Sequence, residues 1–87
     1  MGKRFAVRFS GSAARSLKKL PLPIRVRISR AIDALAENPL PPGARKLKGD
    51  ESSYRIRVGD YRVVYDVLQD VLVILVLRVG HRKDIYR

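Results

Sequence analysis

The chain has no cysteine, no tryptophan and a single histidine, and it has eight acidic residues against nineteen lysines and arginines. Without cysteine, neither a disulfide framework nor a thiolate metal site can form. One histidine and scattered carboxylates offer no ligand set at metal-binding spacing, so we expect no metal and no cofactor. No glycine-rich loop follows a predicted strand, which argues against a nucleotide-binding enzyme.

Long apolar runs are also missing. The longest, residues 71–77, is far too short to span a bilayer. Near the N-terminus, the apolar residues 5–7 lie between Arg4 and Arg8, unlike the apolar centre of a signal peptide. We therefore expect a cytoplasmic protein without membrane association.

The positive charge is the strongest compositional signal. Eighty-seven residues suffice for one small core, and we expect a single domain over residues 1–87. A net charge of +11 on so small a chain indicates a partner that is a polyanion. An acidic protein partner would also satisfy this charge, and it does not exclude RNA.

The first part of the chain predicts a strand followed by two helices. Residues 3–9 alternate in polarity as a strand does. Ser10 or Ser12 is placed to cap a short helix that ends near Leu20. Pro23 fits the first turn of a second helix, which carries an apolar stripe.

The second part predicts a meander of three strands. Pro39 ends the second helix, and residues 39–52 form a basic connector rich in turn formers. Residues 54–65 predict a hairpin, and residues 71–77 predict a central strand that is covered on both faces and ends at Gly80. The fold class is therefore α+β in the order β-α-α-β-β-β: a four-stranded, mainly antiparallel sheet with two N-terminal helices on one face.

The hairpin is the most informative segment, because it separates apolar from cationic residues. A tight turn at Gly59 and Asp60 sets Arg57 opposite Arg62. Alternation then puts the apolar residues on one face and Arg55, Arg57 and Arg62 on the other. Arginines directly opposite one another repel, so this face is predicted to hold an anion, and a nucleic-acid phosphate is the obvious one.

Metal-free RNA cleavage is a chemistry that these residues could support. The 2′-hydroxyl can attack the adjacent phosphorus, and convergent arginines stabilise the charge that develops. Histidine is the side-chain type that changes charge near neutral pH, so His81 is a candidate for proton transfer. Tyr86 could donate a proton or stack on a base. A basic strand face is nevertheless more often a solvated binding surface, so the residues alone indicate a small polyanion binder.

Several motifs together resemble the RelE family of toxins from toxin–antitoxin pairs. In chain order they are Phe9-Ser10, Leu17-Lys-Lys-Leu20, Asn38-Pro39, Lys46-Leu-Lys-Gly49, the hairpin over residues 54–65, and Val79-Gly-His-Arg-Lys-Asp-Ile-Tyr86. The resemblance covers essentially the whole chain. It implies a microbial-ribonuclease fold that cuts mRNA in the ribosomal A site by metal-free 2′-hydroxyl attack. The implied partners are the ribosome, mRNA and a cognate RelB-like antitoxin.

The resemblance also implies roles for individual residues. Arg62 matches the family's phosphate-binding arginine, and Arg82 matches the arginine that stabilises the transition state. Tyr86 matches the C-terminal tyrosine that stacks on or orients the substrate. His81 stands where other members have lysine or histidine.

Two positions depart from the best-known members, which have lysines where this chain has Arg55 and Arg57. Arginine holds phosphate well but stays protonated, so it is a poor general base. The base is therefore open between His81, Tyr86 and the ribosome. We expect catalytic roles for Arg57, Arg62, His81, Arg82 and Tyr86, and phosphate binding by Lys46, Lys48 and Arg55.

Two other functions compete with RNA cleavage. The ParE branch of the same fold class poisons DNA gyrase, and an inactive member would act only as an antitoxin-binding or nucleic-acid-binding module. The set of Arg62, Arg82 and Tyr86 fits the ribonuclease branch.

Overall fold

The computed structural model describes residues 4–47, 49, 52–81 and 83. In chain order its elements are β1 (Ala6–Phe9), α1 (Gly11–Lys19), α2 (Leu22–Leu35), β2 (Arg45–Lys46), β3 (Ser53–Val58), β4 (Tyr61–Leu68) and β5 (Val73–His81). The strands form one mixed sheet in the order β1-β5-β4-β3-β2. Among the strands that the structure describes, only the pairing of β1 with β5 is parallel. No helix in the described part of the chain is long and apolar enough to cross a bilayer.

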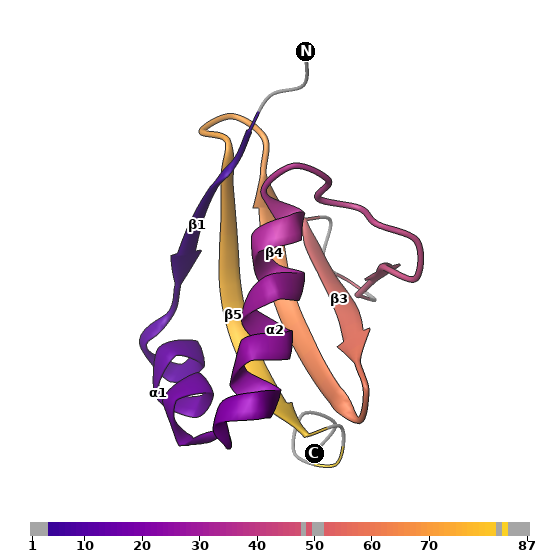
Figure 1. Ribbon diagram of the computed structural model, residues 1–87. Helices are drawn as coiled ribbons and strands as arrows, with labels where there is room; N and C mark the ends of the chain where they lie inside the picture. Colours follow the sequence, from indigo (N-terminus) through magenta and orange to yellow (C-terminus); the bar gives the residue numbers. More distant parts are fainter. Residues whose placement is uncertain (1–3, 48, 50–51, 82, 84–87) are drawn as a thin grey trace.

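The predicted α+β architecture is confirmed, with one strand more than expected. Figure 1 shows α2 lying across one face of the sheet. Residues of α1 pack into the same core as those of α2, so both helices cover this face. The additional strand, β2, lies in the predicted connector, where Arg45 pairs with Arg55 and Lys46 pairs with Tyr54. A strand of two residues is too short to show an alternation of polarity. The turn formers around it therefore led to the prediction of a connector without a strand.

The two helices begin where the sequence predicts. The Ser10 hydroxyl accepts a hydrogen bond from the Ala13 N–H at 3.0 Å and thereby caps α1. Pro23 lies in the first turn of α2, where its missing N–H costs nothing. This helix ends at Leu35, earlier than predicted, because a turn separates it from Pro39.

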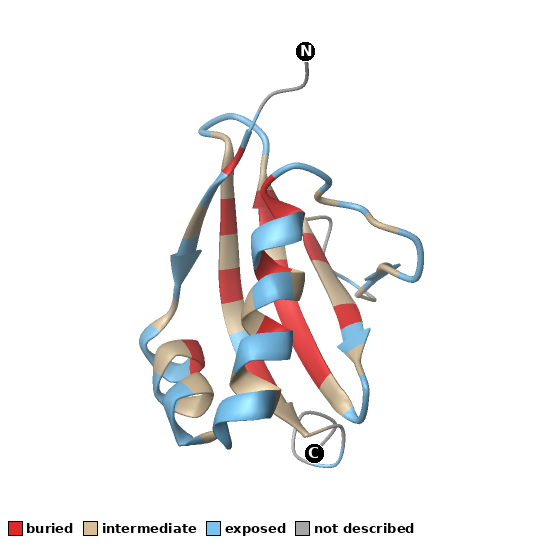
Figure 2. Cartoon of the chain, viewed as in Figure 1, coloured by how far each residue is buried: buried red, intermediate tan, exposed pale blue. Residues whose placement is uncertain are grey.

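The core lies between the helices and the sheet face that they cover, as the buried positions in Figure 2 show. Its largest fully buried side chain is that of Tyr65, whose hydroxyl donates to the Pro39 carbonyl at 2.6 Å. Burial raises the pKa of Tyr65 to about 12, and the nearby Tyr54 adds to the shift. The neutral phenol is therefore part of the packed core.

The last strand, β5, differs from the prediction in its cover and its length. Ile74 and Val76 are buried, whereas Leu75 and Leu77 are only partly buried, because both helices lie on one face. The strand also runs past Gly80 and ends at His81. Its continuous apolar run therefore indicates an interior position in the sheet but not two covered faces.

A β-bulge in β5 reverses the alternation of its side chains. Tyr65 pairs with Val76 and Val64 pairs with Arg78, so Leu77 is the extra residue. Ser10 fixes this point, since its N–H donates to the Val76 carbonyl and its hydroxyl to the Leu77 carbonyl, both at 2.8 Å. Beyond the bulge, Arg78 takes the side turned away from the helices.

Candidate functional site

The β3–β4 hairpin has the predicted register. Arg57 lies opposite Arg62, and the pairs before and after them are those that a two-residue turn requires. The turn uses Gly59, whose φ is 60°. A positive φ at the first turn position suits glycine and matches the twist of the flanking strands. The prediction of two opposed arginines is confirmed.

A row of basic residues crosses the sheet on the face turned away from the helices. Arg45 lies opposite Arg55, Arg55 opposite Val64, and Val64 opposite Arg78. Residues directly opposite one another point to the same face, so this row brings three arginines from three strands together. We call these residues the transverse row: Arg45, Arg55 and Arg78.

The pair of Arg57 and Arg62 forms the next row along the same face, where Arg62 also lies opposite Gly80. We call the surface that carries this pair and the transverse row the arginine face. Asp66 shares the face, and its carboxylate accepts a hydrogen bond from Ser53 on the opposite strand. On the described part of this face, positive charge therefore exceeds negative charge.

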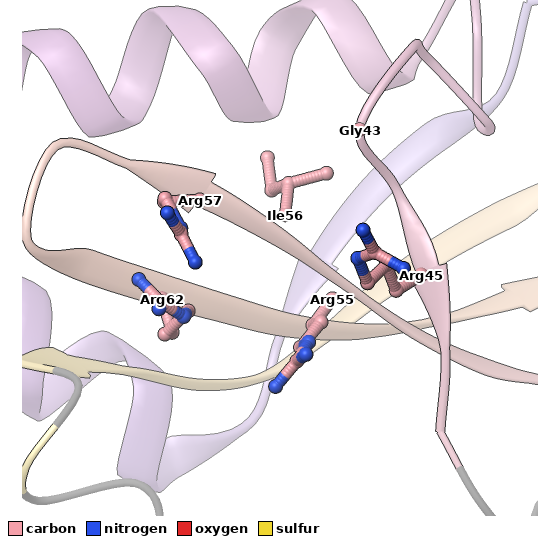
Figure 3. Close-up of a pocket in the computed structure, with 6 residues that line it drawn as sticks. All are labelled: Gly43, Arg45, Arg55, Ile56, Arg57 and Arg62. Atoms are coloured by element: carbon pink, nitrogen blue, oxygen red, sulfur yellow. The ribbon is translucent and has the colours of Figure 1, made fainter.

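A shallow cavity opens on the arginine face. It measures about 280 Å³ and is lined by Gly43, Arg45, Arg55, Ile56, Arg57 and Arg62. Figure 3 shows the side chains of Arg57 and Arg62 turned toward one another, while Ile56 points to the helix side. Guanidinium groups that line one cavity concentrate positive charge there. The geometry therefore suits a phosphate, which guanidinium binds through paired donors.

Arg62 and Arg57 differ in their exposure, and this difference gives each a distinct place in the site. Arg62 is only 5% exposed, and its Nη1 donates to the Tyr61 carbonyl at 3.5 Å. Arg57 is exposed at the rim. A buried charge held by the surrounding protein needs little reorganisation when an anion arrives. Arg62 thus supplies a fixed positive charge at the floor of the cavity, and Arg57 supplies a more adaptable one.

The structure brings some of the predicted residues together and separates others. Arg55, Arg57 and Arg62 line the cavity as expected. Lys46 does not line it, because it lies opposite Tyr54 and so takes the helix side of the sheet. Its neighbour Arg45 lines the cavity instead. Lys48, Arg82 and Tyr86 lie outside the described residues, and their roles stay predictions.

His81 lies on the helix side of the sheet. It pairs with Tyr61, and the two rings meet edge to face with centroids 5.6 Å apart. Tyr61 packs against the core that the helices cover. The Nδ1 atom of His81 accepts a hydrogen bond from the Lys83 N–H at 3.3 Å. The register therefore does not bring the imidazole to the arginine face, and its catalytic role stays a prediction.

Sequence reasoning missed Arg45 and Arg78. Regular alternation from Val76 would turn Arg78 toward the helices, and only the bulge at Leu77 reverses this. Arg45 is one residue from the predicted Lys46, and its side is decided by its pairing with Arg55. Both errors concern pairing, which no local pattern in the chain encodes.

Comparison with known proteins adds a family to this geometry. Residues 7–86 match the family described as ParE toxin of type II toxin–antitoxin system, parDE. Toxin RelE3 of Methanocaldococcus jannaschii is 38% identical over 84 residues, which are 92% of this chain and 93% of that protein. Toxin RelG of Mycobacterium tuberculosis is 34% identical over 84 residues, which cover 95% of this chain and 97% of that protein. Among solved structures, the toxin–antitoxin complex RelBE2 of M. tuberculosis contains a chain with a TM-score of 0.79 and 31% identity, covering 91% of this chain and 92% of that one.

Proposed function

Because this chain belongs to the ParE toxin family of type II toxin–antitoxin systems, whose members similar to it are named RelE and RelG, we propose that it is a ribosome-dependent mRNA endonuclease. It is the toxin of a RelBE-type pair. The finer proposal is that it enters the ribosomal A site, cuts mRNA there and so stops translation.

One observation carries the proposal: Arg57 and Arg62 face each other across a cavity that Arg45 and Arg55 extend. RNA supplies its own nucleophile, because the 2′-hydroxyl can attack the adjacent phosphorus and expel the 5′-oxygen. The phosphorane gains negative charge during this step, and groups fixed before the reaction stabilise it most. Arg62 fulfils this requirement because it is buried and held.

The arginines cannot move the protons, since guanidinium stays protonated. His81 rests against Tyr61 on the other side of the sheet. We therefore assign proton transfer to Tyr86 or to a group of the ribosome, with Arg82 adding charge stabilisation as the family motif implies. If a ribosomal group completes the site, the protein should leave free mRNA uncut.

The proposed protein partner is a cognate RelB-like antitoxin. The similar M. tuberculosis chain belongs to a toxin–antitoxin complex. A net charge of +11 favours a partner with an acidic segment that neutralises part of the arginine face. An antitoxin on this face would block mRNA by occupying the same positive surface.

Mapping mRNA 5′ ends in a reconstituted translation reaction tests the proposal. The wild-type protein should create new ends confined to ribosome-occupied codons. The Arg62→Ala variant should not, while Arg30→Gln, which removes a charge from the exposed side of α2, should behave as wild type. Continued translation with no new ends at equal protein concentration would overturn the proposal.

Gyrase inhibition is the second candidate, because the matching family carries the ParE name. It requires no converging arginines, and the cavity therefore favours the ribonuclease. A supercoiling assay with purified gyrase separates the two functions. Inhibition that persists in the Arg57→Ala and Arg62→Ala double variant would favour gyrase.

A further inference from the structure

The transverse row crosses the strands and continues beyond the cavity. Neighbouring strands lie about 4.8 Å apart, so the row from Arg45 on β2 to Arg78 on β5 spans about 14 Å. The row of Arg57 and Arg62 lies about 7 Å further along the strands, two residues from Arg55. The cavity is thus lined by Arg45 and Arg55 toward β2, and a further cation, Arg78, lies beyond it on β5.

From this arrangement we propose that the transverse row binds the phosphates that flank the scissile phosphate, so that the RNA strand crosses the β-strands rather than following them. Arg45 would hold the strand at the β2 edge and Arg78 at β5. The identity of the polyanion as RNA rests on the proposed function, whereas the direction of the strand rests on the register alone.

Two features favour a phosphodiester strand as a ligand of the transverse row. Arg45 and Arg78 are exposed, and guanidinium groups donate paired hydrogen bonds to phosphate oxygens. Val64, between Arg55 and Arg78, is buried and leaves a gap without charge in the row. Arg55 and Arg78 are therefore separated by one uncharged residue, as the phosphates of an RNA strand are separated by uncharged sugars.

The bulge supports the inference independently. Without the extra residue at Leu77, regular alternation would turn Arg78 toward the helices. The local distortion thus delivers a cation to the arginine face, and bulges commonly redirect a side chain next to a functional site.

The test measures binding of a uridine hexanucleotide without ribosomes, by fluorescence anisotropy over a series of salt concentrations. Each lost phosphate contact should reduce the slope of log affinity against log salt by about 0.7. Arg78→Gln and Arg45→Gln should each show this loss, with affinity about fivefold weaker at low salt. Arg78→Lys should retain the slope. The matched control Arg30→Gln removes the same charge from the helix side and should change neither quantity.

A dinucleotide provides the length test, because its single phosphodiester fits the cavity without reaching Arg78. We expect Arg78→Gln to bind the dinucleotide as wild type does. Thermal melting followed by circular dichroism should show that the variants are folded, as expected for exposed side chains.

Three outcomes would overturn the inference. The first is that Arg78→Gln has the same slope of log affinity against log salt as wild type. The second is that wild type shows no measurable binding of the hexanucleotide at low salt. The third is weaker binding of the antitoxin with unchanged binding of RNA, which would make the row a protein-docking surface. Each leaves the endonuclease proposal standing, because that proposal depends on cleavage in ribosomes and on Arg62.

Discussion

The imidazole of His81 stands edge-on to the phenol of Tyr61, at an interplanar angle of 80°, on the side of the sheet that the helices cover. Arg57 and Arg62 lie on the other side. The one side-chain type that titrates near neutral pH is thus separated by the sheet from the positive charges that it was predicted to assist.

We expect His81→Gln to cleave mRNA on programmed ribosomes within a few-fold of the wild-type rate, since the ring does not face the cavity. Single-turnover cleavage at several pH values checks this, with Arg62→Ala as the inactive reference. A large loss of rate would instead assign the proton transfer to His81.

Arg62→Ala should lower the cleavage rate by about 10²- to 10³-fold, the usual effect of removing one preorganised charged donor from a transition state. The affinity of the protein for the ribosome should change little, because many other cations remain. Separate measurement of binding and cleavage distinguishes the two effects. An equal loss in both would mean that Arg62 serves binding rather than the transition state.

Ser10→Ala should lower the free energy of unfolding by about 1 to 3 kcal/mol. The substitution removes the cap of α1 and the hydrogen bond to the Leu77 carbonyl. Urea unfolding measures the loss. Ser12→Ala is the matched control, because Ser12 is exposed within α1 and does not cap it, and its effect should stay within about 0.5 kcal/mol.

Tyr65 should make stability decrease between pH 10 and about pH 12. Its pKa is raised to about 12 in the folded state, so above pH 10 the unfolded chain releases a proton that the folded chain keeps. The unfolded state is thereby favoured, and the stabilising contribution that is complete below pH 10 falls by about 1.4 kcal/mol per pH unit.

Urea unfolding of wild type and Tyr65→Phe at pH 8 and pH 11 isolates this effect from the titration of lysines, which both proteins share. The unfolding free energy of wild type minus that of Tyr65→Phe should be smaller at pH 11 than at pH 8. An unchanged difference would show that the phenol ionises as easily in the folded state as in the unfolded one.

The parts of this structure that could be predicted are those encoded by neighbouring residues. Gly59 and Asp60 set the hairpin turn, and from that turn the opposition of Arg57 and Arg62 follows by counting. Ser10 and Pro23 likewise identify the helix starts within their own turns. Each of these features depends on contacts a few residues apart.

The missed parts depend on pairing between distant segments. Which of Arg45 and Lys46 reaches the arginine face is decided by the alignment of β2 with β3. The side taken by His81 follows from an extra residue whose position is fixed by the α1 cap. No local period reports either relationship, so a sequence pattern places these residues near the site but not on a face.

The bulge at Leu77 also favours the native register of β5 against β4 over a register without the extra residue. If β5 paired with β4 without it, Arg78 would be driven into the core and Val79, which is 5% exposed in the native sheet, would be turned out to water. A sheet in this register would lose stability twice, because it would bury the uncompensated charge of Arg78 and expose the apolar side chain of Val79. The extra residue therefore keeps Arg78 in water and Val79 in the core at the same time.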